Sequence, residues 1–490
     1  MYAPPGFGLA EVGDVEVFPE GDRLHLFHLT LPNHDVVQHV VSEDGLAWTA
    51  LPNALRTSDP GACDDDQIWT MSVTERAGAA GGDADPRYAM LYTALSRAER
   101  GLVQRTALAL SDDLIHWTKS AANPVGEADP RWYEATTAES GRVSWRDPKP
   151  IRVGDTYYAA VCGRERAGPK HRRGVVGLLA SADLLTWEPR PPLFAPHRGW
   201  DLECPQVFEI GGHYYLTAAL MEDRTQRYWV ADQFEGPYQT PAGGNILVPK
   251  GHYAGRICRW QGLDLYYCWH RPVPVPGQFG EYDWPGFRNP AGKLVPPPLV
   301  LEQHPDGTLT CASFPGWEQY RAAPPAPAQA DCPAGWQLTT APGSVEIVAG
   351  THDRPDVLFE GALTLQAAAG GLIFRLDDDE GGYTITLTPG TADVILAKSF
   401  ETIRPEDALP WLRYQELQRG QLRQPLTAGE AHTFRLLVVG AYIECSIDGE
   451  VVIATASQER QSGRFGVWAE SGQASIADAR WSPMRRPAHR

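Results

Sequence analysis

Short apolar stretches separated by turn residues dominate the first 320 residues of the chain. Five of these stretches are rich in aromatic and aliphatic residues and follow a turn, and they begin at Arg23, Arg87, Asp155, His213 and Asp264. Each is followed by a second apolar stretch, and helical periodicity is nearly absent. Strands of this length, bounded by turn residues and repeated five times, are typical of a β-propeller with five blades.

A short sequence repeat supports the same architecture. The pattern Ser-x-Asp-x-x-x-Trp occurs at residues 42–48, 111–117 and 181–187, so that its serines lie 69 and 70 residues apart. A fixed period of this size indicates repeated structural units. A β-sandwich is the alternative for the aromatic strands alone, and three near-identical copies of the pattern favour the propeller.

The composition changes near residue 321. Residues 321–335 are rich in Pro and Ala and predict a linker. Short alternating strands return over residues 336–485, which is typical of a β-sandwich; the more polar stretch 405–424 within them predicts a short helix or a long loop. We therefore expect an all-β protein with a five-bladed β-propeller over residues 1–320 and a C-terminal β-sandwich.

Charge and cysteine content narrow the partners. A formal net charge of −18 argues against nucleic acid or an anionic membrane as the main partner, whereas a neutral sugar is compatible with it. The eight cysteines form no CxxC pair or Cys/His cluster, so no zinc site is expected, and scattered thiols fit a reducing compartment. No basic segment followed by an apolar run opens the sequence, so we expect a cytoplasmic protein without a signal peptide.

Three carboxylates occupy equivalent positions in three of the expected blades. Asp14 and Asp147 stand seven residues before the glycine that precedes the aromatic strand, and Glu203 stands eight residues before it. The strand before the aromatic one would line the central channel, so the three acids are expected to converge at one mouth of it. Clustered carboxylates repel one another, and one of them tends to hold a proton near neutral pH. Glycosidases use such a pair, in which the protonated acid donates a proton and the ionised acid acts as nucleophile or base.

Several motifs resemble those of glycoside hydrolase family 32, the family of invertases, levanases and inulinases. WRDPKP at 145–150 resembles its RDP motif, and WDLECPQVFEI at 200–210 resembles its ECP motif. The stretches at 39–55, 111–125 and 296–320 are also similar, so the resemblance spans the first 320 residues. It implies a furanosidase propeller with five blades followed by a β-sandwich.

The first motif departs from the family pattern. The family has an Asn-Asp-Pro-Asn-Gly run, whereas this chain has VGDVEVF, with Gly13 and Val15 in place of the Asn and the Pro. In the IWTMS stretch, Met71 stands where the family has Gly. Both changes fall at the end of the site where the family binds its sugar, so they bear on the substrate more than on the class of reaction.

The resemblance implies a role for each candidate residue. Asp14 would be the nucleophile, Asp147 the stabiliser of the transition state and Glu203 the general acid/base. Arg146 would hydrogen-bond the sugar and lower the pKa of neighbouring acids. The sugar subsite would be walled by four aromatic residues: Trp69, Trp200, Tyr253 and Trp269. The implied activity is a retaining hydrolase that releases terminal furanosyl units, above all from β-fructofuranosides, with no metal and no cofactor.

Two other functions stay open at this point. A furanosyl- or fructosyltransferase would use a sugar hydroxyl in place of water, and the sequence hardly separates it from a hydrolase. A non-catalytic carbohydrate-binding propeller would account for the altered first motif, but it has no need of three converging acids. For the sandwich, capping of the propeller, glycan binding and homo-oligomer formation are all compatible with the sequence.

Overall fold

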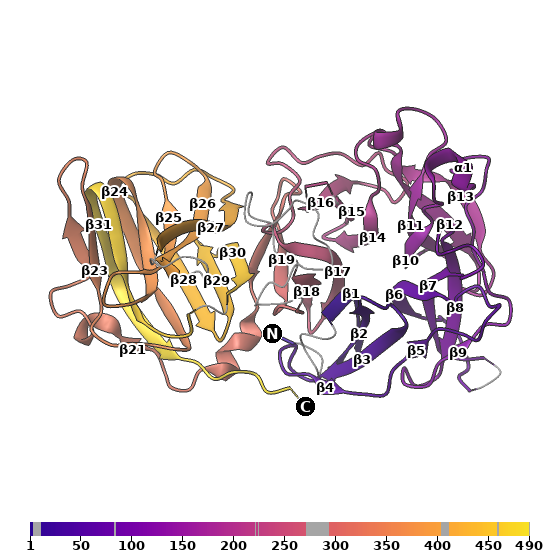
Figure 1. The fold of residues 1–490 in the computed structure, drawn as a ribbon, viewed down its shortest axis with the longest axis horizontal. Helices are drawn as coiled ribbons and strands as arrows, with labels where there is room; N and C mark the ends of the chain where they lie inside the picture. Colours follow the sequence, from indigo (N-terminus) through magenta and orange to yellow (C-terminus); the bar gives the residue numbers. More distant parts are fainter. Residues whose placement is uncertain are drawn as a thin grey trace.

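The computed structural model describes two all-β domains that lie side by side (Figure 1). The described helices are short: α1 (Thr137–Ser140), η1 (Lys170–Arg172), η2 (Pro315–Tyr320) and η3 (Ala328–Ala330). None of the helices in the described part of the chain is long and apolar enough to cross a membrane. The description covers residues 1–2, 11–82, 85–220, 222–223, 225–270, 294–402, 411–457 and 460–489.

The first domain is a propeller of five antiparallel sheets, as the sequence predicted (Figure 1). Blade one contains β1 (Glu11–Glu20), β2 (Arg23–Leu31), β3 (Val36–Ser42), β4 (Thr49–Ala50) and β5 (Leu55–Arg56). Blade two contains β6 (Gln67–Glu75), β7 (Tyr88–Leu95), β8 (Arg105–Ser111) and β9 (Thr118–Lys119). Blade three contains β10 (Arg146–Val153), β11 (Thr156–Arg164), β12 (Gly174–Ser181) and β13 (Glu188–Phe194). Blades four and five contain β14 (Glu203–Ile210), β15 (His213–Leu220), β16 (Thr225–Ala231), then β17 (His252–Trp260), β18 (Leu263–His270), β19 (Leu299–Gln303) and β20 (Leu309–Ser313).

The first strand of each blade lies next to the propeller axis. β1 contacts β6 and β17, and β10 contacts β6 and β14, so these five strands form the innermost ring. The five aromatic stretches are the second strands, namely β2, β7, β11, β15 and β18. They are almost wholly buried, because each second strand packs against neighbouring blades on both of its faces.

The Ser-x-Asp-x-x-x-Trp repeat forms the turn after the third strand in blades one to three. In blade three, Asp183 Oδ1 accepts hydrogen bonds from the backbone N–H groups of Leu185 (2.8 Å) and Thr186 (2.9 Å). The indole of Trp187 donates to the carbonyl of Leu184 at 3.0 Å. Leu184 has a φ of 66°, and the equivalent residues of the other two copies are also left-handed. The repeat is therefore a side-chain-capped turn that each blade uses to enter its outer strand.

Replacing Asp183 with alanine is expected to lower the free energy of unfolding by about 1 kcal/mol, because two backbone donors lose their acceptor in the turn. Denaturant unfolding followed by tryptophan fluorescence measures this change. Asp155→Ala is the matched control, since that carboxylate is fully exposed and its one contact, to Arg152, is 3.5 Å long. Equal stabilities of the two variants would contradict a stabilising role for the turn.

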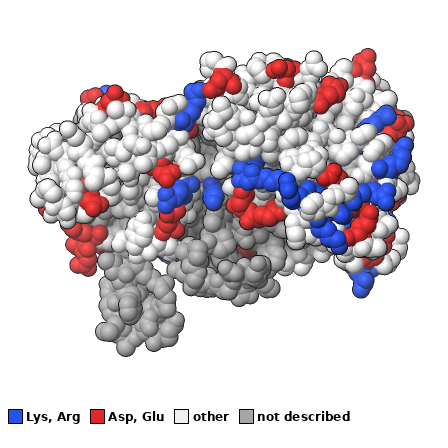
Figure 2. Space-filling model, turned by 90° about the horizontal axis from the view of Figure 1, so that it is seen from above, with Lys and Arg blue, Asp and Glu red and all other residues white. Residues whose placement is uncertain are grey.

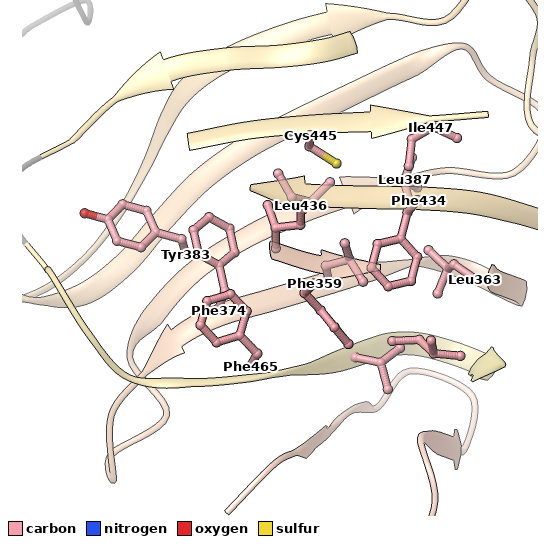
Figure 3. Close-up of a cluster of buried hydrophobic side chains, with 14 of the residues drawn as sticks. Phe359, Leu363, Phe374, Tyr383, Leu387, Phe434, Leu436, Cys445, Ile447 and Phe465 are labelled. Atoms are coloured by element: carbon pink, nitrogen blue, oxygen red, sulfur yellow. The ribbon is translucent and has the colours of Figure 1, made fainter. Parts of the chain in front are cut away.

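The second domain is a strongly bent sheet of eleven strands that folds over one apolar core, which is a β-sandwich. Its strands are β21 (Ala326–Pro327), β22 (Gln337–Thr339), β23 (Val345–Ala349), β24 (Val357–Leu376), β25 (Gly382–Leu387), β26 (Asp393–Thr402), β27 (Trp411–Gln421), β28 (Ala431–Val439), β29 (Tyr442–Ile447), β30 (Glu450–Ala456) and β31 (Arg464–Pro483). The long strands β24 and β31 pair along most of their length. Figure 3 shows the aromatic centre of the core, which includes Phe359, Phe374, Phe434 and Phe465.

Two segments differ from simple loops. Within the Pro- and Ala-rich stretch 321–335, β21 pairs with β31 and Ala328 is fully buried in the core of the sandwich, so this stretch packs against the second domain. The polar stretch 405–424 was expected to form a helix or a loop, and this expectation is wrong for residues 411–421, which form strand β27. Pairing with β26 supplies the backbone hydrogen bonds of this strand. Residues 403–410 lie outside the described residues.

The two domains share apolar and polar contacts. Trp317 of η2 stacks on Tyr442 of β29 with ring centroids 6.1 Å apart, and Asp306 pairs with Arg423 at 2.7 Å. A cavity of about 700 Å³ lies between β16 and β20 of the propeller and β27 and β30 of the sandwich.

On the face seen in Figure 2, a band of basic side chains runs beside acidic ones, so that face carries both signs of charge.

Candidate active site

Irregular register of the five innermost strands shapes the mouth of the central channel. Each has a shift near its beginning, at Val12/Val15, Trp69/Met71, Arg146/Lys149, Glu203/Gln206 and Tyr253/Arg256. A β-bulge of this kind bends a strand and re-aims a side chain. Asp147 and Cys204 lie at two of these bulges and have left-handed backbones, with φ of 62° and 48°. Such conformations are strained for residues other than glycine and concentrate at functional sites.

The bulges bring Asp14 and Asp147 together. A carboxylate oxygen of each and the sulfur of Cys204 all lie within 4.8 Å of one another. The Thr70 hydroxyl donates to Asp14 Oδ2, and the backbone N–H of Cys204 donates to Asp147 Oδ2 at 2.9 Å. Blades one, two, three and four therefore each contribute a group to one small site, and two carboxylates from distant parts of the sequence are close neighbours.

Glu203 joins this site through Arg146. The guanidinium Nη2 of Arg146 lies 2.9 Å from Glu203 Oε1, and its Nε lies 3.5 Å from Asp147 Oδ2. The hydroxyl of Tyr253 donates to the other carboxylate oxygen of Glu203. The Glu203 side chain is 17% exposed, against 3% for Asp147 and for Arg146. Glu203 is therefore the more exposed member of this group, and Arg146 and Tyr253 each hold one of its carboxylate oxygens.

The environment favours the protonated form of two of the acids. Burial raises the pKa of Glu203 above its usual value, and the opposing effects of Arg146 and of the Tyr253 hydroxyl do not cancel this rise. Burial also raises the pKa of Asp147, and the nearby Asp14 adds to the rise against the pull of Arg146. The site thus places two acids of raised pKa, Glu203 and Asp147, close to Asp14. A protonated acid beside an ionised one is the pairing that glycoside hydrolysis uses.

A buried ionic layer forms the floor of the site. Glu16, two residues after Asp14 on β1, pairs with Lys149 at 2.5 Å and faces Arg256 at 3.7 Å. Arg256 also donates to the backbone carbonyls of Cys204 at 3.0 Å and of Pro205 at 3.1 Å. This arginine from blade five thereby ties down the bulge that follows Glu203, because a buried guanidinium needs each of these acceptors.

The four aromatic residues expected at the sugar subsite take different places. Trp69 is partly exposed on β6, next to Thr70, and its indole donates to Gln67 at 2.7 Å. Trp200 is partly exposed under the guanidinium of Arg164, 3.9 Å from its ring centroid. Tyr253 reaches Glu203 directly. Trp269 is buried and meets the ring of Tyr253 edge-on, with ring centroids 5.9 Å apart.

The altered first motif has a packing explanation. A Cβ atom on Gly13 would lie 2.9 Å from Leu29 Cβ and 3.3 Å from the Leu31 side chain, so β2 leaves no room for a larger residue at this position. Val15 is fully buried in the apolar cluster around Trp260 and Tyr267. The positions on both sides of Asp14 therefore serve the core, and the acid alone faces the site.

Asp14, Asp147 and Cys204 also form a donor set that could be offered to a cation. Burial raises the pKa of the Cys204 thiol well above its usual value. A thiol that keeps its proton is a poor metal ligand, since metals bind the thiolate. In its protonated form, Cys204 therefore does not complete a set of metal ligands with the two carboxylates.

Several groups at the site were not singled out from the sequence. Thr70 sits at the bulge of β6, and Arg256 reaches the site from blade five; no local motif marks either residue. Asp201 precedes Glu203 by two positions in the WDLECP motif, and it contacts Arg146 at 2.9 Å. Of these three residues, only Asp201 is marked by the sequence, because it stands two positions before a candidate catalytic acid and a second acid so close needs a cation to neutralise it.

Asp147→Asn is expected to raise the melting temperature at pH 7 by about 2 °C or more. Because the folded-state pKa of Asp147 is raised, its contribution to stability is fully present below the unfolded pKa and is lost as the pH rises through the folded pKa. The asparagine side chain does not ionise, so the variant avoids this loss of stability at neutral pH and gains no stability at acidic pH. Calorimetry at pH 7 and at pH 4, with Asp155→Asn as control, measures the difference. A lower melting temperature for Asp147→Asn at pH 7 would contradict this reading.

The comparison of sequences supports a glycoside hydrolase as the class of this protein. Residues 18–255 match the model of the glycosyl hydrolases family 32 N-terminal domain. This match confirms the resemblance to glycosyl hydrolase family 32 that the RDP and ECP motifs predicted. The sequence has no significant match among curated proteins.

Solved structures similar to this chain cover both of its domains. Fructan 1-exohydrolase IIa from Cichorium intybus superposes with a TM-score of 0.69 at 16% identity, over 100% of this chain and 97% of that one. An exo-inulinase from Aspergillus awamori gives 0.70 at 15% identity, over 99% and 97%. A β-fructofuranosidase from Bombyx mori gives 0.65 at 19% identity, over 99% and 93%. At these identities the similarity confirms the fold of propeller plus sandwich.

Proposed function

We propose that this protein is a retaining glycoside hydrolase that releases terminal fructofuranosyl units from small fructosides or fructans. One observation carries the proposal: Asp14 and Asp147 have oxygens within 4.8 Å of each other at the channel mouth, and Arg146 links Asp147 to Glu203. The similar structures support the sugar class, since they include a fructan exohydrolase in complex with 1-kestose and a β-fructofuranosidase in complex with sucrose.

In the first step of the proposed reaction, a carboxylate oxygen of Asp14 attacks the anomeric carbon of the fructosyl unit. The bond from that carbon to the leaving oxygen breaks as Glu203 donates its proton to that oxygen. Burial raises the pKa of Glu203, which favours the protonated form that this step needs. Thr70 orients the attacking carboxylate, because its hydroxyl holds the Oδ2 of Asp14 and leaves the other oxygen for attack.

In the second step, Glu203 is a carboxylate and takes a proton from water. The water oxygen bonds to the anomeric carbon, the ester bond to Asp14 breaks, and fructose leaves with its original configuration. Asp147 accepts hydrogen bonds from hydroxyls of the sugar ring and counters the positive charge that develops on the ring. Each side chain starts the next cycle in the protonation state in which it began.

The decisive experiment is incubation of the protein with sucrose, 1-kestose, inulin and levan, with chromatography of the products. Release of fructose, seen first by NMR as the β-anomer before mutarotation, is the expected result. Products longer than the substrate in place of free fructose would indicate a transferase instead. Binding of these sugars by calorimetry without any product would indicate a carbohydrate-binding propeller and would end the proposal of catalysis.

A further inference from the structure

A fourth carboxylate, Asp201, lies beside the proposed catalytic acids and takes part in no step of the proposed reaction. Its side chain is completely buried just before β14, and three arginines face it. Arg142 Nη2 lies 2.6 Å and Arg146 Nη2 lies 2.9 Å from Asp201 Oδ2, and Arg164 Nη1 lies 3.9 Å from the other oxygen. Burial of a carboxylate costs free energy, and the nearby arginines compensate for that cost. We therefore asked what the negative charge of Asp201 does for its neighbours.

Arg146 divides one positive charge among three carboxylates. Its Nη2 atom is 2.9 Å from Asp201 Oδ2 and also 2.9 Å from Glu203 Oε1, while its Nε faces Asp147. A guanidinium stays protonated in proteins, so the charge is constant and only its partners share it. The negative charge of Asp201 therefore weakens the stabilisation that Arg146 gives to the ionised form of Glu203.

We infer that Asp201 is a positioning residue that acts through Arg146. It fixes the guanidinium against Glu203 and competes with Glu203 for its positive charge, so that Glu203 retains a proton. The inference rests on the proposed role of Glu203 as the general acid. An acid that faced an unshared arginine would lose its proton too easily to serve in the first step.

The other charged and titratable groups around Glu203 agree with this role. Those that act on it are Arg146 and Asp147 from β10, Tyr253 from β17, Asp201 from the segment before β14, and the thiols of Cys162 on β11 and Cys204 on β14. Asp201 itself is an effective anion: burial opposes its ionisation, but Arg146 and Arg142 hold its pKa below the usual value. Its negative charge therefore persists over the range in which Glu203 titrates.

Arg164, the third cation near Asp201, has a carboxylate partner of its own. Glu134 Oε2 accepts from Arg164 Nε at 2.8 Å, and both side chains are completely buried. Glu134 also pairs with Arg173 at 2.7 Å and accepts from the Ser140 hydroxyl at 2.9 Å. The charge of Arg164 is thus largely matched on its far side, which leaves Arg142 and Arg146 as the main partners of Asp201.

Two variants with opposite expected effects test the inference. Asp201→Asn still offers an oxygen to Arg146 but no charge, so the pH at which kcat/KM for sucrose falls on the alkaline side is expected to drop by about one unit. Arg142→Gln removes a cation that neutralises Asp201, so the same limb is expected to move to higher pH. Arg142 is 34% exposed, and its replacement keeps the test available if Asp201→Asn does not fold.

Asp331→Asn is the matched control, because it removes a buried carboxylate that pairs with Arg354 in the second domain and has no contact with Asp201 or its arginines. Its alkaline limb is expected to stay where it is in the wild type. An unchanged limb in both Asp201→Asn and Arg142→Gln, or shifts in the same direction, would overturn the inference. A merely structural role for Asp201 would lower kcat or the melting temperature without moving the limb.

A measurement without substrate separates this inference from the proposed function. The pKa of Glu203 is read from the ¹³C NMR titration of protein labelled at the glutamate carboxyl carbons, with Glu203→Gln to assign the signal. If the wild type releases no fructose but the Glu203 titration shifts as expected in Asp201→Asn and Arg142→Gln, the hydrolase is refuted and the coupling is supported. A wild type that releases fructose, with no shift in the variants, would refute the coupling alone.

Discussion

Asp14→Ala is expected to lower kcat on sucrose by about 10⁴-fold or more, because no other described carboxylate occupies its place at the channel mouth. The fold should persist, since the change removes a charge that faces Asp147 and leaves the buried flanks Gly13 and Val15 intact. Initial rates of fructose release, with circular dichroism to verify folding, measure the effect.

A small external nucleophile sharpens this test. Azide or formate fits the space that the missing carboxylate leaves, so it is expected to restore turnover in Asp14→Ala and to give a fructosyl product of inverted configuration. Asp22→Ala, at the exposed turn after β1, is the matched control and should retain the wild-type rate. A near wild-type rate for Asp14→Ala without any added anion would place the nucleophile elsewhere.

Glu203→Gln is expected to lower kcat on sucrose by about 10²- to 10⁴-fold and to abolish the alkaline limb of its pH profile. The amide cannot donate the proton that the departing oxygen needs. The raised pKa of Glu203 sets the sign in the wild type: activity is present below that pKa, where the acid is protonated, and falls as the pH rises through it. Rates measured between pH 4 and pH 9 give both quantities.

A substrate with a better leaving group distinguishes loss of the general acid from disruption of the whole active site. With an aryl fructofuranoside, the departing phenolate needs little help from a proton, so the first step in Glu203→Gln should lose far less and give a burst of phenolate. Glu209→Gln, an exposed residue of the same strand β14, is the control and should behave as the wild type. Equal losses on sucrose and on the aryl substrate would contradict the assignment of Glu203 as the acid.

Much of the architecture follows from local pattern. Five aromatic second strands and three copies of the Ser-x-Asp-x-x-x-Trp turn predict blades, because each blade is a local unit whose strands are joined by short turns. The polar stretch that includes β27 shows the limit of this reasoning. Nothing within Trp411–Gln421 favours a strand strongly, and its pairing with β26 supplies the partner that makes it one.

The candidate site was found only in part. Asp14, Asp147 and Glu203 could be chosen because the blade repeat puts them in equivalent positions. Thr70 and Arg256 could not, because their relevance depends on bulges and on contacts between blades that are far apart in sequence. Trp269 is expected at the sugar subsite, and the structure places it edge-on against Tyr253, which contacts Glu203.

The sequence by itself determined the all-β class, the number of blades and the equivalent positions of three acids in three blades, because these depend on periodicity within short segments. Only the tertiary structure decided how those acids share their charges. The distances from Arg146 to Asp147, Asp201 and Glu203 arise where blades three and four meet, and the bulges that fix them are set by packing across the propeller axis. Electrostatic coupling falls steeply with distance and rises with burial, and both quantities exist only in the folded chain.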